Sequence, residues 1–157
     1  MSALPQFYHG QLQTPTDDDT RLLGELQATI GDLTMPLVLE DFEMVSKVCG
    51  LCSYFAPELY MACGGTADTG VWAKDFIAFW SNLSQSNHDL ESKLVAVMNP
   101  DEAALTPDDW RDMVTYVLNE HPGLEFLAES PEYHERYVDT VIARIYYNCD
   151  RSVCSYL

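Results

Sequence analysis

Apolar residues recur at helical spacing along most of this chain, and the longest such run lies between residues 130 and 148. Its start is marked by Ser130 and Pro131, because a hydroxyl side chain can cap the first free amides and proline fits the first helical position. The apolar residues that follow repeat every three or four positions and form one broad face of a helix. They are Tyr133, Tyr137, Val141, Ile142, Ile145 and Tyr146. The pattern predicts a helix packed on its neighbour as a helical hairpin.

Shorter amphipathic segments precede this helix. His121 ends the segment before it, since Pro122 disfavours the α conformation in the preceding residue. Gly31 and Gly50 are stops for two earlier segments. The first expected helix runs from the acidic cap Thr16–Asp19 to Gly31. Further helices are expected over 39–49, 57–61, 75–86 and 89–98, and another begins at Thr106-Pro107. Everything strongly periodic is helical, so the predicted fold class is all-α.

Composition and charge narrow the functional classes. The 157 residues are 47% apolar and 11% aromatic, which suits one core or two small ones and excludes a mainly disordered chain. The formal net charge of −17 repels nucleic acid and anionic membranes and favours basic partners or divalent cations, although simple solubility also accounts for it. No apolar run approaches the roughly 18 residues of a membrane span. We therefore expect no nucleic acid and no membrane among the partners.

The cysteines indicate a reducing compartment. Five are present, an odd number, and the N-terminal segment lacks the charged leader and apolar core of a signal peptide. Cys49 and Cys52 form a CxxC pair, and Cys63 follows eleven residues later. A zinc site would need further paired ligands, and a redox pair would follow a strand rather than a helix end. We interpret these residues as buried structural thiols of a cytoplasmic or nuclear protein.

Residues typical of catalysis occur, but not in catalytic arrangements. His88 adjoins Asp89 and His134 adjoins Glu135, yet sequence neighbours on a helix point in different directions. No nucleophile elbow, Walker loop or dinucleotide-binding motif is found. The sequence predicts that the chain is not an enzyme.

Three loops can be laid on the twelve-residue template of an EF-hand, which has oxygen ligands at positions 1, 3, 5 and 12 and glycine at position 6. An amphipathic helix precedes each loop, and each has an apolar residue at position 8, where paired EF-hand loops meet. The loops are Gly64–Asp75 with Val71, Met98–Asp109 with Leu105, and Asp150 onward with Leu157. The pattern predicts EF-hand-like helix pairs.

The oxygen ligands of these loops are incomplete, so the loops are degenerate. Thr66, Asp68 and Asp75 stand at positions 3, 5 and 12 of the first loop, whose position 1 is a glycine. The second loop has Met98 and Pro100 where ligands belong. The third offers Asp150 and Ser152 at positions 1 and 3 and a soft thiol, Cys154, at position 5. Asp150 and Ser152 are the candidate metal ligands, and no cofactor is expected in this chain.

Four stretches together resemble the B″ class of regulatory subunits of protein phosphatase 2A. The most specific feature is the segment His121–Leu127 (HPGLEFL), which lies just ahead of the tyrosine-rich helix. The stretches are Leu4–Tyr8 (LPQFY), Asp41–Gly50 (DFEMVSKVCG), Gly64–Trp80 (GGTADTGVWAKDFIAFW) and His121–Asn148. The resemblance that runs through them extends over nearly all of the chain in order, and it corresponds to the N-terminal, EF-hand-like part of the family's conserved region.

The resemblance implies a non-catalytic regulatory subunit that selects or targets substrates. Members of this family dock on the scaffold A subunit and the catalytic C subunit and present phosphoprotein substrates to them. The resemblance also implies calcium binding in a longer form, and it allows a centrosomal location. The alternative is a free-standing EF-hand-like calcium sensor or adaptor without a phosphatase role.

The resulting organisation has an extended arm at 1–16, an EF-hand-like helical domain at 17–148 and the start of a truncated EF-hand loop at 149–157. Tyrosine and tryptophan are frequent interface anchors. Trp72 adjoins the position-8 residue of a loop, where it is less easily buried, and is therefore an interface candidate. Phe7 and Tyr8 of the arm are the others, whereas Trp80 and Trp110 have core positions.

Overall fold

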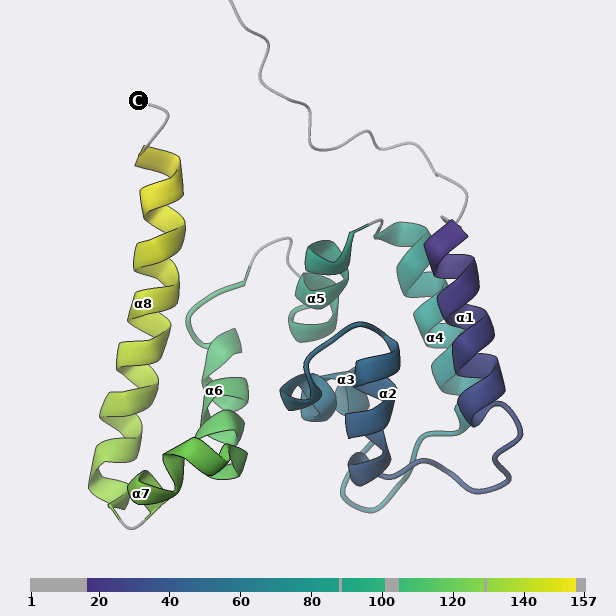
Figure 1. Cartoon of the computed structure of the whole chain (residues 1–157), viewed down its shortest axis with the longest axis horizontal. Coiled ribbons are helices and arrows are strands. Elements are labelled where there is room, and N and C mark those ends of the chain that lie inside the picture. The colour runs from purple at the N-terminus through teal and green to yellow at the C-terminus, as the bar shows by residue number, and fades with distance from the viewer. Residues whose placement is uncertain (1–16, 88, 101–104, 129, 155–157) are drawn as a thin grey trace, which may run out of the picture.

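The computed structural model describes residues 17–87, 89–100, 105–128 and 130–154, which fold into α-helices with short 3-10 segments between them (Figure 1). This confirms the predicted all-α class. The α-helices are α1 Asp17–Ile30, α2 Phe42–Val48, α3 Ala56–Ala62, α4 Ala73–Ser86, α5 Leu90–Met98, α6 Asp109–Glu120, α7 Glu125–Ala128 and α8 His134–Cys154. The 3-10 segments are η1 Leu39–Asp41, η2 Ser53–Phe55, η3 Pro122–Leu124 and η4 Pro131–Tyr133.

The first four α-helices form one lobe made of two helix–loop–helix units. In Figure 1, α1 lies beside α4 and α2 lies against α3, so the two units face each other. Their loops meet at an isolated antiparallel β-bridge between Leu37 and Val71. The largest buried side chains of this lobe include Phe42, Phe76 and Trp80, whose rings contact one another edge-on or stacked. Aromatic packing thus fills the centre of the lobe.

The fifth helix, α5, closes this lobe. It contacts α3 and α4, and Val97 belongs to the same buried cluster. Lys93 reaches back to α1, where its Nζ lies 2.6 Å from Oδ1 of Asp19 and 5.8 Å from the centroid of the Trp80 ring. The sequence predicts Asp19 as part of a helix cap, whereas the structure makes it a buried partner of this ion pair.

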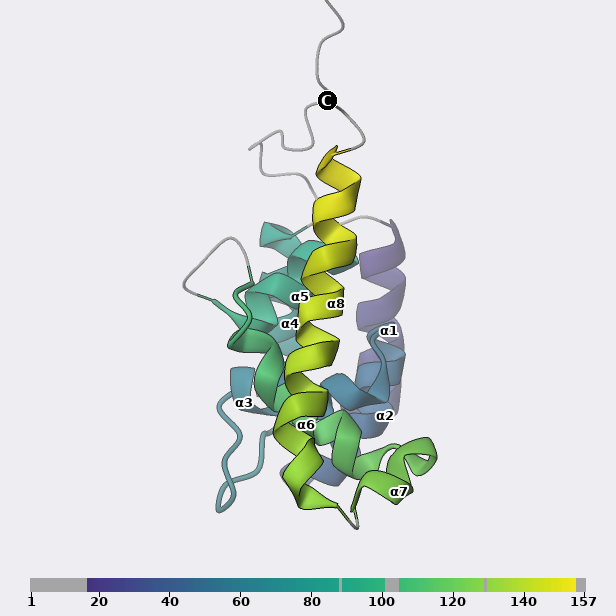
Figure 2. The same cartoon turned by 90° about the vertical axis from the view of Figure 1, so that its left-hand side faces the viewer.

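The remaining helices form a second, smaller unit. Helices α6 and α8 pack as the expected hairpin, with α7 turning the chain between them (Figure 2). The buried residues of this unit are Val114, Leu118, Val138 and Ile142. Contact with the first lobe is made where η2 meets α6 and where the Tyr54 ring stacks on His121 at 5.9 Å.

Several expected boundaries need correction. α2 begins at Phe42 because η1 occupies the first predicted turn, and α6 begins at Asp109 because residues 107 and 108 form a turn. α8 continues to Cys154, so the loop predicted from residue 149 is wrong over 149–154. Neither glycine nor proline occurs after Pro131 to end that helix. None of the described helices is long and apolar enough to cross a membrane.

Candidate functional site

The candidate site is built around the paired loops of the first lobe. Leu37 and Val71 exchange both backbone hydrogen bonds: Leu37 N–H donates to the Val71 carbonyl (2.7 Å) and Val71 N–H to the Leu37 carbonyl (2.9 Å). Val71 holds position 8 of its loop, so the predicted pairing of apolar position-8 residues is found here. Its partner, Leu37, is position 8 of a twelve-residue loop over 30–41 that the sequence reasoning missed. The overlooked signal is the set Asp32, Thr34 and Asp41 at positions 3, 5 and 12 of that loop, where Gly31 is interpreted only as a helix stop.

The loop Gly64–Asp75 is closed by hydrogen bonds between its own residues and with Tyr60 of the preceding helix. The Tyr60 hydroxyl, from α3, lies 3.0 Å from the Thr66 carbonyl oxygen and 2.8 Å from that of Thr69, to which it can donate. The hydroxyls of Thr66 and Thr69 lie 2.7 Å apart, and the Thr69 amide also donates to the Thr66 hydroxyl. Thr66, at position 3 of the template, therefore uses its hydroxyl for hydrogen bonds within the loop. The Tyr60 hydroxyl links the two ends of the turn.

Two glycines allow the backbone to approach closely here. A Cβ on Gly65 would lie 2.6 Å from the Tyr60 ring, and one on Gly70 would lie 2.7 Å from the carbonyl oxygen of Leu37. Both distances are shorter than ordinary van der Waals contacts. Gly70, at position 7, therefore lets the loop meet Leu37, which accounts for a glycine displaced from position 6.

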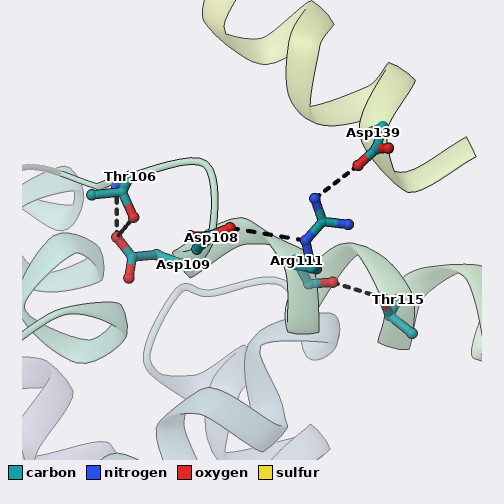
Figure 3. Close-up of polar contacts among 6 residues, drawn as sticks. All are labelled: Thr106, Asp108, Asp109, Arg111, Thr115 and Asp139. Carbon is teal, nitrogen blue, oxygen red and sulfur yellow. Dashed lines mark hydrogen bonds and ion pairs between the residues drawn. The ribbon is translucent and has the colours of Figure 1, made fainter. Parts of the chain in front are cut away.

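The acids at position 12 of two loops also bond to loop amides. Asp41 accepts from the Val38 amide at 3.0 Å. Asp109 accepts from the Thr106 amide at 2.6 Å and from the Thr106 hydroxyl at 2.9 Å (Figure 3). It also accepts from the Asn99 side chain at 3.1 Å. These bonds, led by the one from the Thr106 backbone, lower the pKa of Asp109. Each carboxylate fixes the entry to its following helix.

The loop Met98–Asp109 and the helix after it, α6, are each tied to α8 by one polar contact. Arg111 of α6 donates to Asp139 of α8 at 2.7 Å (Figure 3), and the Tyr146 hydroxyl donates to the Leu105 carbonyl at 2.6 Å. Leu105 is position 8 of the loop Met98–Asp109, the place that Val71 holds in the first lobe. In the second unit this carbonyl bonds to a tyrosine of α8.

The sequence predicts metal ligation at Asp150 and Ser152. Both lie on the helical backbone of α8, and a continuous helix is not the conformation of a calcium loop. Among the described residues, no group of three His, Cys, Asp or Glu could hold a metal ion. Ligation by Asp150 and Ser152 stays a prediction.

A pocket of about 690 Å³ lies beside the paired loops, and we call it the loop pocket. Its apolar wall comes from α3, η1 and the end of the loop over 30–41, and its other wall is the turn of the loop Gly64–Asp75. The lining residues are Val38, Leu39, Glu40, Pro57, Tyr60, Met61 and the stretch 65–70. The side chain of Met61, which belongs to this lining, is 57% exposed.

Further apolar side chains are exposed on the paired loops. Trp72 is 46% exposed, and Met35, two residues before Leu37, is 75% exposed. Trp80 is buried, as expected, and Trp110 packs partly buried against the second cluster. Phe7 and Tyr8 lie outside the described residues. The interface role of all three candidates remains a prediction, and the exposure of Trp72 is compatible with it.

The described residues considered for catalysis include Cys49, Cys52, Cys63 and His134. Burial raises the pKa of Cys49, with the neighbouring Cys63 adding to the effect, and burial raises the pKa of Cys63 to about 12. Such thiols are poor nucleophiles at neutral pH. Cys52 is exposed, so its expected burial is wrong. His134 Nε2 lies 2.8 Å from the Leu127 carbonyl oxygen, a contact between α7 and α8, and His88 lies outside the described residues.

Comparison with known proteins agrees with this geometry. A family model described as "P2R3B, EF-hand" matches residues 35–83, which include the bridge, α2, α3 and most of α4, and one described as "EF-hand domain" matches residues 89–157. The helix–loop–helix pairs with bridged position-8 residues thus define a protein of the EF-hand class.

Relatives make the assignment more particular. The chain is 33% identical over 95% of its length to the human B″ alpha regulatory subunit of serine/threonine-protein phosphatase 2A, and 32% identical over 96% to its human B″ beta counterpart. A probable B″ delta subunit of Arabidopsis thaliana is 31% identical over 95%. The chain therefore belongs to the B″ family of regulatory subunits. It spans 13%, 27% and 28% of the lengths of these three relatives, so it corresponds to one part of them.

Proposed function

We propose that this chain is a non-catalytic regulatory part of protein phosphatase 2A, acting by binding rather than by chemistry. The observation that carries the proposal is the similarity to B″ regulatory subunits along nearly the whole chain, through both helical units. The raised pKa values of the Cys49 and Cys63 thiols are compatible with a role without catalysis.

The proposed partners are the scaffold A subunit, the catalytic C subunit and phosphoprotein substrates. The exposed apolar side chains of the paired loops give the first lobe a surface for docking on the scaffold's helical repeats. Trp72 is the anchor we assign to this contact, because an exposed tryptophan buries a large apolar area when a partner covers it. A cytoplasmic or nuclear site of action, including the centrosome, belongs to the same proposal.

The direct test is calorimetric titration of the full chain with purified scaffold subunit and, separately, with the scaffold–catalytic complex. We expect binding to the scaffold, weakened about tenfold or more by Trp72→Ala, as for an interface anchor. Tyr147→Ala is the matched control, because Tyr147 is also exposed (60%) but lies on α8. Absence of scaffold binding by the unmodified chain would overturn the proposal.

A parallel titration with calcium separates this function from a free-standing sensor. Binding to the scaffold in EGTA favours the regulatory role, since the closed loop Gly64–Asp75 needs no ion to hold its shape. Tight calcium binding without detectable binding to the scaffold subunit would favour the calcium sensor. The relatives carry the name of phosphatase regulatory subunits, which does not favour the sensor.

A further inference from the structure

The loop pocket has the chemistry of a peptide-binding site. Its volume of about 690 Å³ lies within the range of roughly 300–1,000 Å³ typical of ligand pockets. Val38, Leu39 and Met61 are each more than a third exposed although they line it, so their apolar surface is uncovered in this chain. Exposed methionine side chains adapt to varied apolar partners. An apolar side chain from a partner would therefore be stabilised here by burial.

The charged residues of the loop pocket are all acidic. Glu40 lies on the η1 wall and Asp68 on the opposite turn, and the lining includes no lysine or arginine. Neither acid makes an ion pair with the described basic residues. The surrounding chain carries a formal charge of −17, which adds to the negative potential. A partner that brings cations to both walls would satisfy these carboxylates.

We propose that the loop pocket binds a short peptide segment of another protein, with one large apolar side chain inserted against Met61 and lysine or arginine residues flanking it towards Glu40 and Asp68. The proposal concerns peptide recognition by this chain alone and goes beyond docking on the phosphatase scaffold, which we assign to Trp72. The two can therefore fail independently.

Charge argues against the other occupants. A second copy of this chain would bring another −17 to an acidic surface, and the copies would repel each other. Residues 1–16 include Leu4, Phe7 and Tyr8 as apolar anchors but no lysine or arginine, so the arm lacks the complementary cations. A basic, apolar segment of a different protein fits best.

The experiment is a selection of random dodecapeptides on the full chain. Peptides that also bind a triple variant, Glu40→Lys, Met61→Gln and Asp68→Lys, are removed. We expect the enriched peptides to carry an apolar residue flanked by lysine or arginine and to bind at least tenfold more tightly to the unmodified chain. Raising the salt from about 0.05 to about 0.5 M should weaken binding, because exposed charges are screened.

The matched control is a second triple variant, Glu43→Lys, Met44→Gln and Glu91→Lys. These residues are likewise exposed but lie outside the pocket, so binding should remain within about twofold. Circular dichroism and thermal unfolding are the checks that both variants fold. In labelled protein, the best peptide should shift the amide resonances of Leu39, Met61 and residues 65–70.

Four results would overturn the proposal. The first is that no peptide is enriched, and the second is that the enriched peptides are acidic or bind both variants equally. The third is that deleting residues 1–16 shifts the pocket resonances and creates peptide binding that the full chain lacks, which would make the arm the occupant. The fourth is a dimer in sedimentation that the pocket variant dissociates, which would make a second copy the occupant.

Discussion

Leu37 and Val71, which are 34 positions apart in the sequence, bond to each other through both backbone amides at 2.7 and 2.9 Å. Leu37 is 2% exposed and Val71 4%, so each side chain is also part of the core under the bridge. The bridge therefore couples loop conformation to the packing of the whole lobe. Changes at the bridge, at the loop ends and at the ion pair behind them should each alter stability in a distinct way.

Replacing Leu37 by alanine should lower the free energy of unfolding by about 3 kcal/mol, because a buried leucine leaves a cavity when it is truncated. Urea denaturation measures the loss. Leu33→Ala is the control, since Leu33 lies in the same loop but is 48% exposed, and it should change stability by less than about 1 kcal/mol. Equal losses for the two variants would show that Leu37 is not the core residue of the bridge.

Gly70→Ala and Gly24→Ala should change stability in opposite directions. A Cβ on Gly70 would press on the Leu37 carbonyl, whereas a Cβ on Gly24, on the exposed side of α1, meets no atom within 4 Å. Alanine at 24 should stabilise the protein by up to about 1 kcal/mol through helix propensity. Alanine at 70 should lower the thermal midpoint, and an unchanged midpoint would contradict the close approach of the loops.

The charge of Asp109 should make stability depend on acidity. Its hydrogen bonds to Thr106 and Asn99 lower its pKa in the folded state below the usual 3.8. The stabilisation is therefore fully present above the unfolded pKa and is lost as the pH falls through the folded pKa. Asp109→Asn should be less stable than the unmodified chain at pH 7, and the two should converge at strongly acidic pH. Urea melts over that range, with the exposed Asp32→Asn as the control, would refute this if the difference were independent of pH.

Single and double variants should show how much the buried ion pair between Asp19 and Lys93 contributes to stability. Lys93→Met leaves the carboxylate of Asp19 buried without its cation and should cost about 3 kcal/mol or more. Adding Asp19→Leu should restore part of the loss, because the uncompensated charge is then removed. Lys74→Met, on the exposed face of α4, is the control. A double variant no more stable than Lys93→Met would show that desolvation of the carboxylate is not the cause.

The helices were predictable because their periodicity and stop residues are local features. Gly31, Gly50 and His121 end helices close to where the sequence places them, and the tyrosine-rich helix packs on its predecessor. Tyr133, expected on the apolar face, is 54% exposed, whereas Val138 is buried instead. The pattern identified the helix but not the rotation of its first turn, which η4 changes.

The candidate site was predictable only in part. Val71 at position 8 was correctly expected to pair, but its partner, Leu37, was missed because Gly31 was interpreted only as a helix stop and the loop over 30–41 was not laid on the template. The role of Tyr60 depends on a turn closed by tertiary packing, and the Asp19–Lys93 pair spans 74 positions. The loop pocket likewise combines η1, α3 and a distant turn, which no local pattern brings together.

The most direct test of the central claim, that hydrogen bonds and apolar packing hold the loop pair without an ion, is amide hydrogen exchange at Leu37 and Val71 with and without calcium. We predict slow exchange at both amides in EGTA, unchanged by added calcium. Protection that develops only when calcium is added would contradict the account.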